Sequence, residues 1–255
     1  FGSPEGGERI VKTAAEAFGR VDILINNAGI LRDKTFVKME PENWQPVIAV
    51  HLNGAYNVTR PAFTKMKEQG YGKIIMTTSA AGLYGNFGQT NYSSAKMGIV
   101  GLMNTIKLEG AKYNIKINTV APVAYSRLTE DVMPPEMSAR MQPDYVAGLV
   151  LYLCSDDCNE SGLIFNVGAG YHNRAAIMTG NGAVLSDGKT VPTPEDIRDN
   201  WDNINSLENA REIQDATSAI TSFLAPPSSE TSHKSGTGTN DVKGVFAKMP
   251  EAFDA

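Results

Sequence analysis

The chain has 255 residues, of which 42% are hydrophobic, and its formal net charge is −5. This length allows one large domain or two small ones with a buried core. The acidic balance and the lack of a lysine–arginine cluster argue against nucleic acid as a partner. The apolar runs are too short to span a bilayer, and the start of the chain shows no secretory signal.

The two cysteines, Cys154 and Cys158, have C-x3-C spacing without a nearby histidine. We therefore expect no metal site and a reducing compartment.

Strand and helix patterns alternate along the first two thirds of the chain. Apolar runs rich in isoleucine and valine predict buried strands at 21–29, 72–80, 116–122 and 163–170. Periodic patterns predict helices at 8–18, 41–70, 91–113 and 143–155. Gly19 and Gly70 suit the ends of the first two helices. The alternation predicts an α/β fold, a Rossmann-like doubly wound parallel sheet with helices on both faces.

A dinucleotide-binding sheet of this kind normally opens with a strand, a glycine-rich turn and a helix that holds the pyrophosphate. We find no such unit near the start, so we expect residues 1–172 to form the catalytic part of the domain without its first βαβ unit. The glycines of 168–170 follow the last strand and lack the third glycine of the motif, so they do not replace it.

Three regions follow this domain. Residues 173–225 predict a helical C-terminal extension, with two amphipathic helices in 192–225. Residues 226–239 are rich in Pro, Ser, Thr and Gly and predict a linker. Residues 240–255 begin a new helical pattern.

Residues 79–96 hold a candidate proton-transfer site. Tyr92 and Lys96 are four residues apart, so on a helix they share one face. An ammonium beside a phenol favours the phenolate, and we expect Lys96 to lower the pKa of Tyr92. Ser79, at the end of a strand, could hold a substrate oxygen against the phenol. Such a site would interconvert an alcohol and a ketone, although a Tyr-x-x-x-Lys pair alone occurs by chance in many helices.

These residues, with NNAG at 26–29 and Asn53, resemble the motifs of the short-chain dehydrogenase/reductase family. The similarity is greatest to one branch, the (3R)-hydroxyacyl-CoA dehydrogenase part of peroxisomal-type multifunctional enzyme 2. The stretches that carry it are 29–33, 51–60, 84–96 and 121–130. Residues 240–255 resemble the opening helix of a sterol-carrier-protein-2-like domain.

The resemblance implies four catalytic residues, Asn53, Ser79, Tyr92 and Lys96. Tyr92 would act as general acid and base, Ser79 would orient the substrate, and Lys96 would also bind the nicotinamide ribose. Asn53 would open its helix locally and hold a water that bonds Lys96. No chemistry is assigned to His51.

The resemblance also implies a nicotinamide cofactor, which would be NAD. NADP stays open, because the strand end that selects between them is missing. The implied cofactor-binding residues are Asn27, Ala28, Gly29, Tyr92, Lys96, Pro122, Ala124, Tyr125, Ser126 and Thr129. Val123 departs from the glycine that usually follows this proline in the family, and the closer branch also lacks that glycine.

The implied function is hydride transfer between the nicotinamide cofactor and a 3-hydroxyacyl-CoA, as in fatty-acid β-oxidation. One alternative is a 3-oxoacyl-carrier-protein reductase. Another is a chain without activity of its own, because the glycine-rich loop is missing. We further expect a homodimer or homotetramer formed through 41–69 and 91–113, located in the cytoplasm, or in the peroxisome if the source is eukaryotic.

Overall fold

The computed structural model describes residues 2–126, 138–224 and 226. The chain divides into two units, 1–175 and 176–255, which are treated separately below. Three predictions fall outside the described residues: Thr129, nearly all of the linker and the helical start at 240–255.

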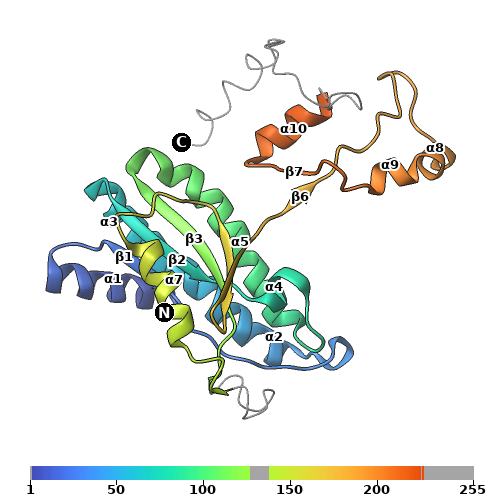
Figure 1. Cartoon of the computed structure of the whole chain (residues 1–255). Helices are drawn as coiled ribbons and strands as arrows, with labels where there is room; N and C mark the ends of the chain where they lie inside the picture. The colour runs from blue at the N-terminus through green and yellow to red at the C-terminus, as the bar shows by residue number, and fades with distance from the viewer. Residues whose placement is uncertain (1, 127–137, 225, 227–255) are drawn as a thin grey trace. The chain divides into compact units, whose positions relative to one another are not determined.

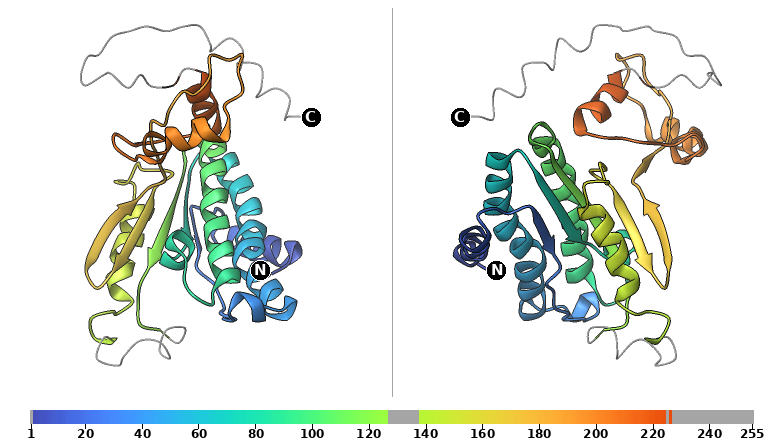
Figure 2. Two further views of the ribbon diagram at one scale, coloured as in Figure 1. Left: turned by 90° about the vertical axis from the view of Figure 1, so that its right-hand side faces the viewer. Right: turned by 60° about the vertical axis from the view of Figure 1, so that its left-hand side comes forward.

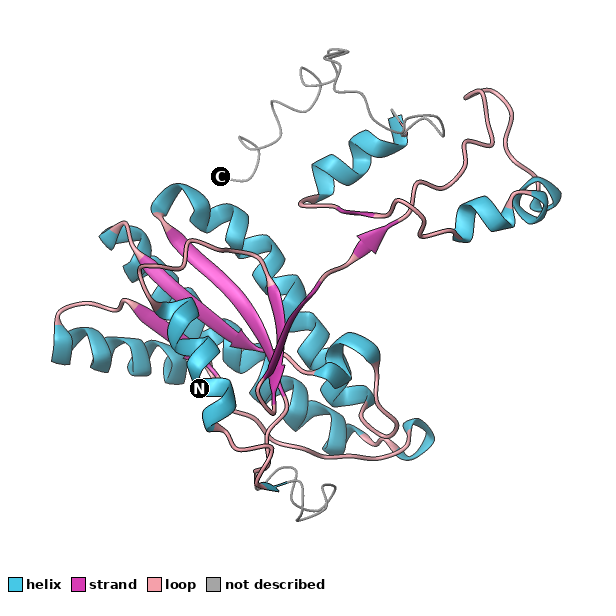
Figure 3. Ribbon diagram, viewed as in Figure 1, coloured by secondary structure: helices cyan, strands magenta, loops and turns pink. Residues whose placement is uncertain are grey.

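The first unit is built on a five-stranded sheet with the order β1-β2-β3-β4-β5 (Figures 1 and 3). Its strands are β1 (Ile23–Asn26), β2 (Gly72–Thr77), β3 (Ile115–Pro122), β4 (Ile164–Gly168) and β5 (Tyr171–Ala175). The first four run parallel, which confirms the predicted α/β sheet, and β5 is antiparallel to β4. Because β1, β2 and β3 are parallel neighbours, their carboxyl ends lie at the same edge.

Helices cover both faces of this sheet (Figure 2). The main ones are α1 (Pro4–Phe18), α2 (Pro41–Ile48), α3 (Gly54–Gln69), α5 (Thr90–Gly110) and α7 (Asp144–Cys154). α3 and α5 lie on one face, with α1 packed against α3, and α7 lies on the other face. Gly19 and Gly70 end α1 and α3 in the left-handed conformation, as their positions in the sequence predict.

Alternate strand residues supply the two halves of the core, because successive side chains point to opposite faces. On β2, Ile74 and Met76 join the cluster under α3 and α5, whereas Ile75 joins the cluster under α7. All three are at most 1% exposed. A strand buried on both faces reads as a continuous apolar run, and this is why 72–80 is predictable from the sequence.

The predicted helix at 41–70 is divided in the structure. Between α2 and α3 the chain makes a π-helical segment, Ala49–Asn53. Such wide turns often occur at functional sites. Two further short elements were not predicted: η1 (Phe36–Lys38) and α4 (Ala80–Tyr84). The predicted helix at 91–113 ends in a short 3-10 turn, η3 (Ala111–Tyr113).

The antiparallel strand β5 was also not predicted. Ala169 and Gly170 connect β4 to β5, and both have positive φ, 49° and 79°. Two such residues make the type of turn that matches the twist of a hairpin. The glycines at 168–170 therefore turn the chain back on itself, and this hairpin carries the first unit to residue 175.

The second unit has short elements in place of the two predicted amphipathic helices. It contains β6 (Met178–Thr179), α8 (Pro194–Asp199), α9 (Trp201–Asn205), β7 (Arg211–Glu212) and α10 (Ala216–Leu224). Helix α8 ends at Asn200, and β7 then pairs with β6, which interrupts the helical periodicity. In the part of the chain that the structure describes, no helix is both long and apolar enough to cross a membrane.

Candidate active site

Three of the four predicted catalytic residues meet at the carboxyl edge of the sheet. Ser79 follows β2 and caps α4, where its hydroxyl accepts a hydrogen bond of 3.2 Å from the Ala81 N–H. Tyr92 lies in the first turn of α5, and its phenol is hydrogen-bonded to the Ser79 hydroxyl. Lys96 stands one turn further along α5, with its Nζ 5.5 Å from the centroid of the Tyr92 ring. The structure thus brings Ser79, Tyr92 and Lys96 together.

Lys96 is held in place through both its ammonium group and its backbone carbonyl. Its Nζ donates a hydrogen bond of 2.7 Å to the Thr77 carbonyl, and its own carbonyl accepts one of 2.7 Å from the Thr78 hydroxyl. At Gly82, a Cβ would lie 2.6 Å from the Cβ of Lys96, so only glycine lets α4 approach α5 this closely. Lys96 is 3% exposed, and the Thr77 carbonyl occupies one of its three N–H donors.

The pKa of Tyr92 does not follow the prediction from the sequence. Burial raises this pKa above its ordinary value, the Ser79 hydrogen bond opposes the rise, and Asp33 adds to it. Lys96 is not among the groups that shift the phenol. Instead, burial lowers the pKa of Lys96 itself to about 8. The protein alone therefore does not make Tyr92 more acidic, because desolvation outweighs a cation 5.5 Å from the ring centroid.

The predicted cofactor loop begins directly after β1. The side-chain oxygen of Asn27 accepts a hydrogen bond of 3.0 Å from the Thr77 hydroxyl, which ties the loop to the end of β2. Ala28 and Gly29 continue the loop with almost no side chain. At Gly29, a Cβ would lie 2.4 Å from the Cε1 of His51, so the imidazole takes the space that a larger residue would need.

The remaining predicted cofactor residues follow β3. Pro122 is the last residue of that strand, and the Val123 N–H donates to the Val167 carbonyl at 2.8 Å. The Tyr125 N–H donates to the Met141 carbonyl at 2.6 Å. Ala124 and Ser126 lie in the same described stretch. These residues start at the edge where Ser79 lies, because β2 and β3 pair in parallel up to Thr77 and Val120.

The helix is opened locally at Asn53, as the resemblance implies, because this residue ends the π-helical segment. Its side chain is exposed and makes no hydrogen bond to a described residue, so its catalytic role stays a prediction. His51, two residues earlier, is 4% exposed and lies in the site. Its ring meets the Tyr92 ring edge-on at 5.0 Å between centroids. Sequence reasoning assigned no role to His51. Regular helical spacing does not show which residues of a widened turn face inward.

Asn91 is a second residue that sequence reasoning missed. It is fully buried, its amide nitrogen donates to the Arg32 and Asn43 carbonyls at 2.9 Å each, and its oxygen accepts from the Tyr92 N–H at 2.7 Å. Asn91 thereby fixes the start of α5 to the loop after β1 and to α2. The one feature of the sequence that could have indicated a role for Asn91 is its position directly before Tyr92.

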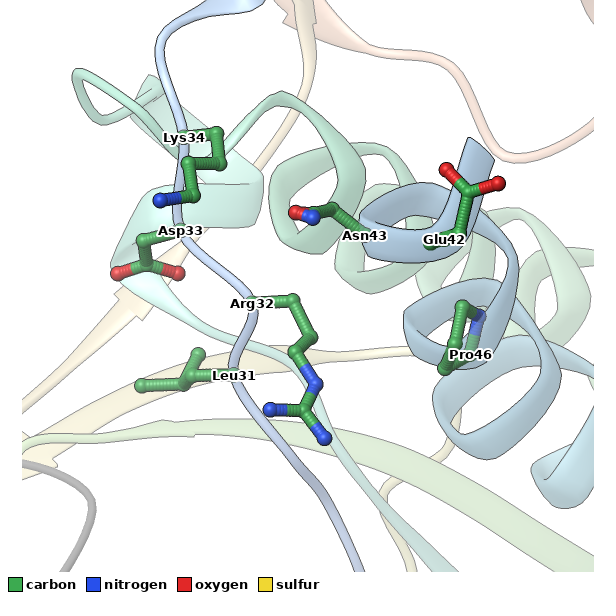
Figure 4. Close-up of a pocket in the computed structure, with 7 residues that line it drawn as sticks. All are labelled: Leu31, Arg32, Asp33, Lys34, Glu42, Asn43 and Pro46. Atoms are coloured by element: carbon green, nitrogen blue, oxygen red, sulfur yellow. The ribbon is translucent and has the colours of Figure 1, made fainter. Parts of the chain in front are cut away.

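A pocket of about 450 Å³ lies beside the start of α5 (Figure 4). Its walls come from the loop after β1 and from α2, and they consist of Leu31, Arg32, Asp33, Lys34, Glu42, Asn43 and Pro46. Gln89, just before α5, donates to the Asp33 carboxylate at 2.8 Å. The pocket therefore adjoins the turn of helix that carries Tyr92.

Comparison with known proteins identifies relatives of the whole first unit. A family model described as short chain dehydrogenase matches residues 2–133. The peroxisomal multifunctional enzyme type 2 of Mus musculus is 45% identical over 264 residues, which cover 100% of this chain and 36% of the mouse protein. The peroxisomal multifunctional enzyme A of Dictyostelium discoideum is 50% identical over 230 residues, which cover 90% of this chain and 51% of that protein.

A solved structure shows the same fold. The full-length peroxisomal multifunctional enzyme type 2 from Drosophila melanogaster superposes with a TM-score of 0.75 at 37% identity. The match covers 87% of this chain and 39% of the Drosophila chain. The chain thus spans about half or less of the length of these three relatives.

Proposed function

The chain belongs to the short-chain dehydrogenase family, and on this premise we propose that it transfers a hydride between a nicotinamide cofactor and a 3-hydroxyacyl-CoA. The observation that carries the proposal is the arrangement of the half-buried Ser79 and Tyr92 beside the buried Lys96 at the carboxyl edge of the sheet. A hydroxyl, a phenol and an ammonium in contact are the groups needed to move a proton at an alcohol oxygen.

In the oxidation direction, Tyr92 takes the proton of the substrate hydroxyl while Ser79 holds that oxygen in place. The nicotinamide supplies the acceptor for the hydride that leaves the carbon. Lys96 stabilises the Tyr92 phenolate once the cofactor and substrate exclude water from the site, because the attraction between two charges is stronger where water is absent. The pKa of Lys96, about 8, keeps the amine mostly protonated at neutral pH.

The residues present fit a nicotinamide cofactor. Ala28 and Gly29 have almost no side chain, so a cofactor can approach the backbone after β1 at these residues. Lys96 gives one N–H to Thr77 and keeps its other N–H donors for a ribose hydroxyl. The residues that would hold the cofactor are Asn27, Ala28, Gly29, Tyr92, Lys96, Pro122, Ala124, Tyr125, Ser126 and Thr129. We propose NAD as the preferred form, following the branch that the sequence resembles.

The substrate proposal rests on the similarity to peroxisomal multifunctional enzymes and on charge. A carrier-protein reductase docks an acidic protein and would favour a basic surface, whereas this chain has a net charge of −5. The CoA thioester is therefore the better candidate, with the pocket beside α5 available for the part of the substrate beyond the reacting carbon. The same similarity supports a peroxisomal location.

We also propose that the chain forms a homodimer through α5. Apart from Glu109 in its last turn, the exposed positions of this helix form a stripe at helical spacing without charge, composed of Ser94, Met97, Gly101, Thr105 and Leu108. A stripe of small and apolar residues allows two such helices to approach closely across a two-fold axis.

Two measurements on the 255-residue chain test the proposed function. Titration calorimetry with NAD and with NADP should show binding, with NAD the tighter ligand. The chain should then oxidise 3-hydroxybutyryl-CoA with the cofactor that it binds. Failure to bind either cofactor would contradict the proposal and support a chain without activity of its own. Binding with turnover of the carrier-protein thioester alone would favour the alternative substrate.

A further inference from the structure

The pocket beside the start of α5 is lined mainly by charged and polar side chains. Of the seven residues that line it, only Leu31 and Pro46 have apolar side chains, and its volume is about 450 Å³. Pockets that take apolar ligands are lined predominantly by hydrophobic and aromatic side chains. This pocket therefore suits a charged group of a ligand better than a hydrocarbon chain.

Hydrogen bonds from buried and backbone groups fix the two walls of the pocket. The fully buried Asn91 donates to the Arg32 carbonyl in the loop after β1 and to the Asn43 carbonyl in α2, at 2.9 Å each. The Lys34 N–H donates to the Gly88 carbonyl, also at 2.9 Å. Because these contacts join the walls to each other and to the segment before α5, the pocket has its shape before a ligand enters, which lowers the cost of binding.

Two cations of the loop have no acidic partner. Among the residues that the structure describes, neither the Arg32 guanidinium nor the Lys34 ammonium forms an ion pair. Figure 4 shows the Arg32 guanidinium in the space beside Pro46, whereas the Asp33 carboxylate points away from α2. Glu42, in the first turn of α2, is the other acidic residue of the lining. An anion in the pocket would thus meet a guanidinium that no protein carboxylate occupies.

Phosphate is the anion that matches such a group. A guanidinium presents its N–H donors in a planar fork that fits phosphate oxygens, and hydrogen bonds between arginine and phosphate are among the strongest in proteins. A 3-hydroxyacyl-CoA carries a diphosphate and a 3′-phosphate at the end remote from its reacting carbon. Since the pocket adjoins the turn of α5 that carries Tyr92, one substrate molecule can extend from the phenol into the pocket.

We propose that this pocket binds the phosphate end of the CoA thioester, with Arg32 as its main ligand and Lys34 as a second, exposed cation. The inference rests on the proposed function and adds to it the residues that select a CoA thioester over a thioester without phosphates. Glu42 opposes the phosphates by its charge, so its removal should strengthen the binding that removal of Arg32 weakens.

Two thioesters of 3-hydroxybutyrate test the proposal, one with CoA and one with N-acetylcysteamine, which has the same reacting carbon and no phosphate. Arg32→Gln should raise KM for the CoA thioester roughly tenfold and leave kcat within about twofold, because the lost contact is the same in the ground state and the transition state. Lys34→Gln should raise this KM about threefold, and Glu42→Gln should lower it. For the N-acetylcysteamine thioester, kcat/KM should change less than about twofold in all three variants.

The matched control is Arg9→Gln, the same substitution at an exposed arginine of α1, for which KM for both thioesters should stay at the wild-type value. Equal losses of kcat/KM for both thioesters in Arg32→Gln would overturn the proposal, since damage to the loop predicts that pattern. An unchanged KM for the CoA thioester in Arg32→Gln would also overturn it.

Calorimetry with free CoA and with NAD separates the two possible sources of the phosphate. CoA should bind to the wild type and bind at least about fivefold more weakly to Arg32→Gln, whereas NAD should bind to both alike. Weaker NAD binding with unchanged CoA binding would assign the pocket to the cofactor and overturn the proposal. A wild-type chain that binds CoA through Arg32 but turns over neither thioester would count against the proposed function alone.

Discussion

At the scale of single residues, burial dominates the electrostatics of the site. It raises the pKa of Tyr92 and lowers the pKa values of Lys96 and His51 to about 8 and about 4. All three shifts disfavour the charged form. In the proposed reaction the Tyr92 phenolate must therefore gain its stabilisation from the complete complex, in which Lys96, the substrate and the cofactor exclude water from the site.

The pKa of His51 makes stability depend on pH. The folded chain keeps His51 neutral down to about pH 4, while the unfolded chain protonates it near 6.5. Between these values the unfolded state binds more protons, so the free energy of unfolding falls as the pH falls from 6.5 to 4, by up to about 3 kcal/mol for this residue.

Urea titrations of wild type and His51→Phe across this pH range should measure that effect. As the pH falls toward 4, the wild type should lose stability relative to His51→Phe, which has no group that titrates at this position. Above pH 7 the difference between the two free energies of unfolding should be constant. A difference that does not change with pH would show that His51 titrates alike in the folded and unfolded chain.

Lys96 has two proposed tasks, and its removal should show both. Lys96→Ala should lower kcat by roughly a hundredfold and should also weaken NAD binding, because a ribose hydroxyl loses its donor. Calorimetry and initial rates measure the two effects separately. Lys107→Ala, a half-buried lysine three turns along α5, is the matched control. Wild-type affinity for NAD in Lys96→Ala would refute the cofactor contact.

At the scale of elements, the site depends on contacts that join segments far apart in the sequence. Asn91 connects α5 to α2 and to the loop after β1. Asn91→Ala leaves two partly buried carbonyls without their donor, and we expect a loss of about 1 to 3 kcal/mol in the free energy of unfolding. Thermal and urea unfolding check this against Asn104→Ala, a half-buried position later in α5. Equal free energies of unfolding for Asn91→Ala and Asn104→Ala would contradict a stabilising role of the Asn91 hydrogen bonds.

The sequence allowed the sheet, the main helices and the group Ser79, Tyr92 and Lys96 to be predicted, because these follow from local patterns. Continuous apolar runs mark β2 and β3, and the four-residue spacing places Tyr92 and Lys96 on one face. The π-helical segment could not be predicted from the residues themselves, because propensities do not reveal one extra residue in a helical turn, and only the family resemblance pointed to a local opening at Asn53. For this reason the place of His51 beside Tyr92 was missed.

At the scale of the whole molecule, the proposed dimer gives α5 a second role. Nothing lies within 4 Å of a Cβ at Gly101 on α5 or at Gly148 on α7, so an arginine fits either place in a single chain. Gly101→Arg should convert the dimer to a monomer in sedimentation or light-scattering experiments. Each subunit would bring one arginine into the interface, and burying two unpaired positive charges there is unfavourable. Gly148→Arg, the control, should leave the mass unchanged. A dimer that survives Gly101→Arg would place the interface elsewhere.

The most direct test of the account compares wild type with Tyr92→Phe in two assays, NAD binding by calorimetry and turnover of 3-hydroxybutyryl-CoA. Phenylalanine keeps the ring against His51 and removes the one oxygen that exchanges the proton. The account predicts that the variant binds NAD like the wild type and that its turnover is lost. Turnover near the wild-type rate would contradict Tyr92 as the acid and base, and with it the proposed site.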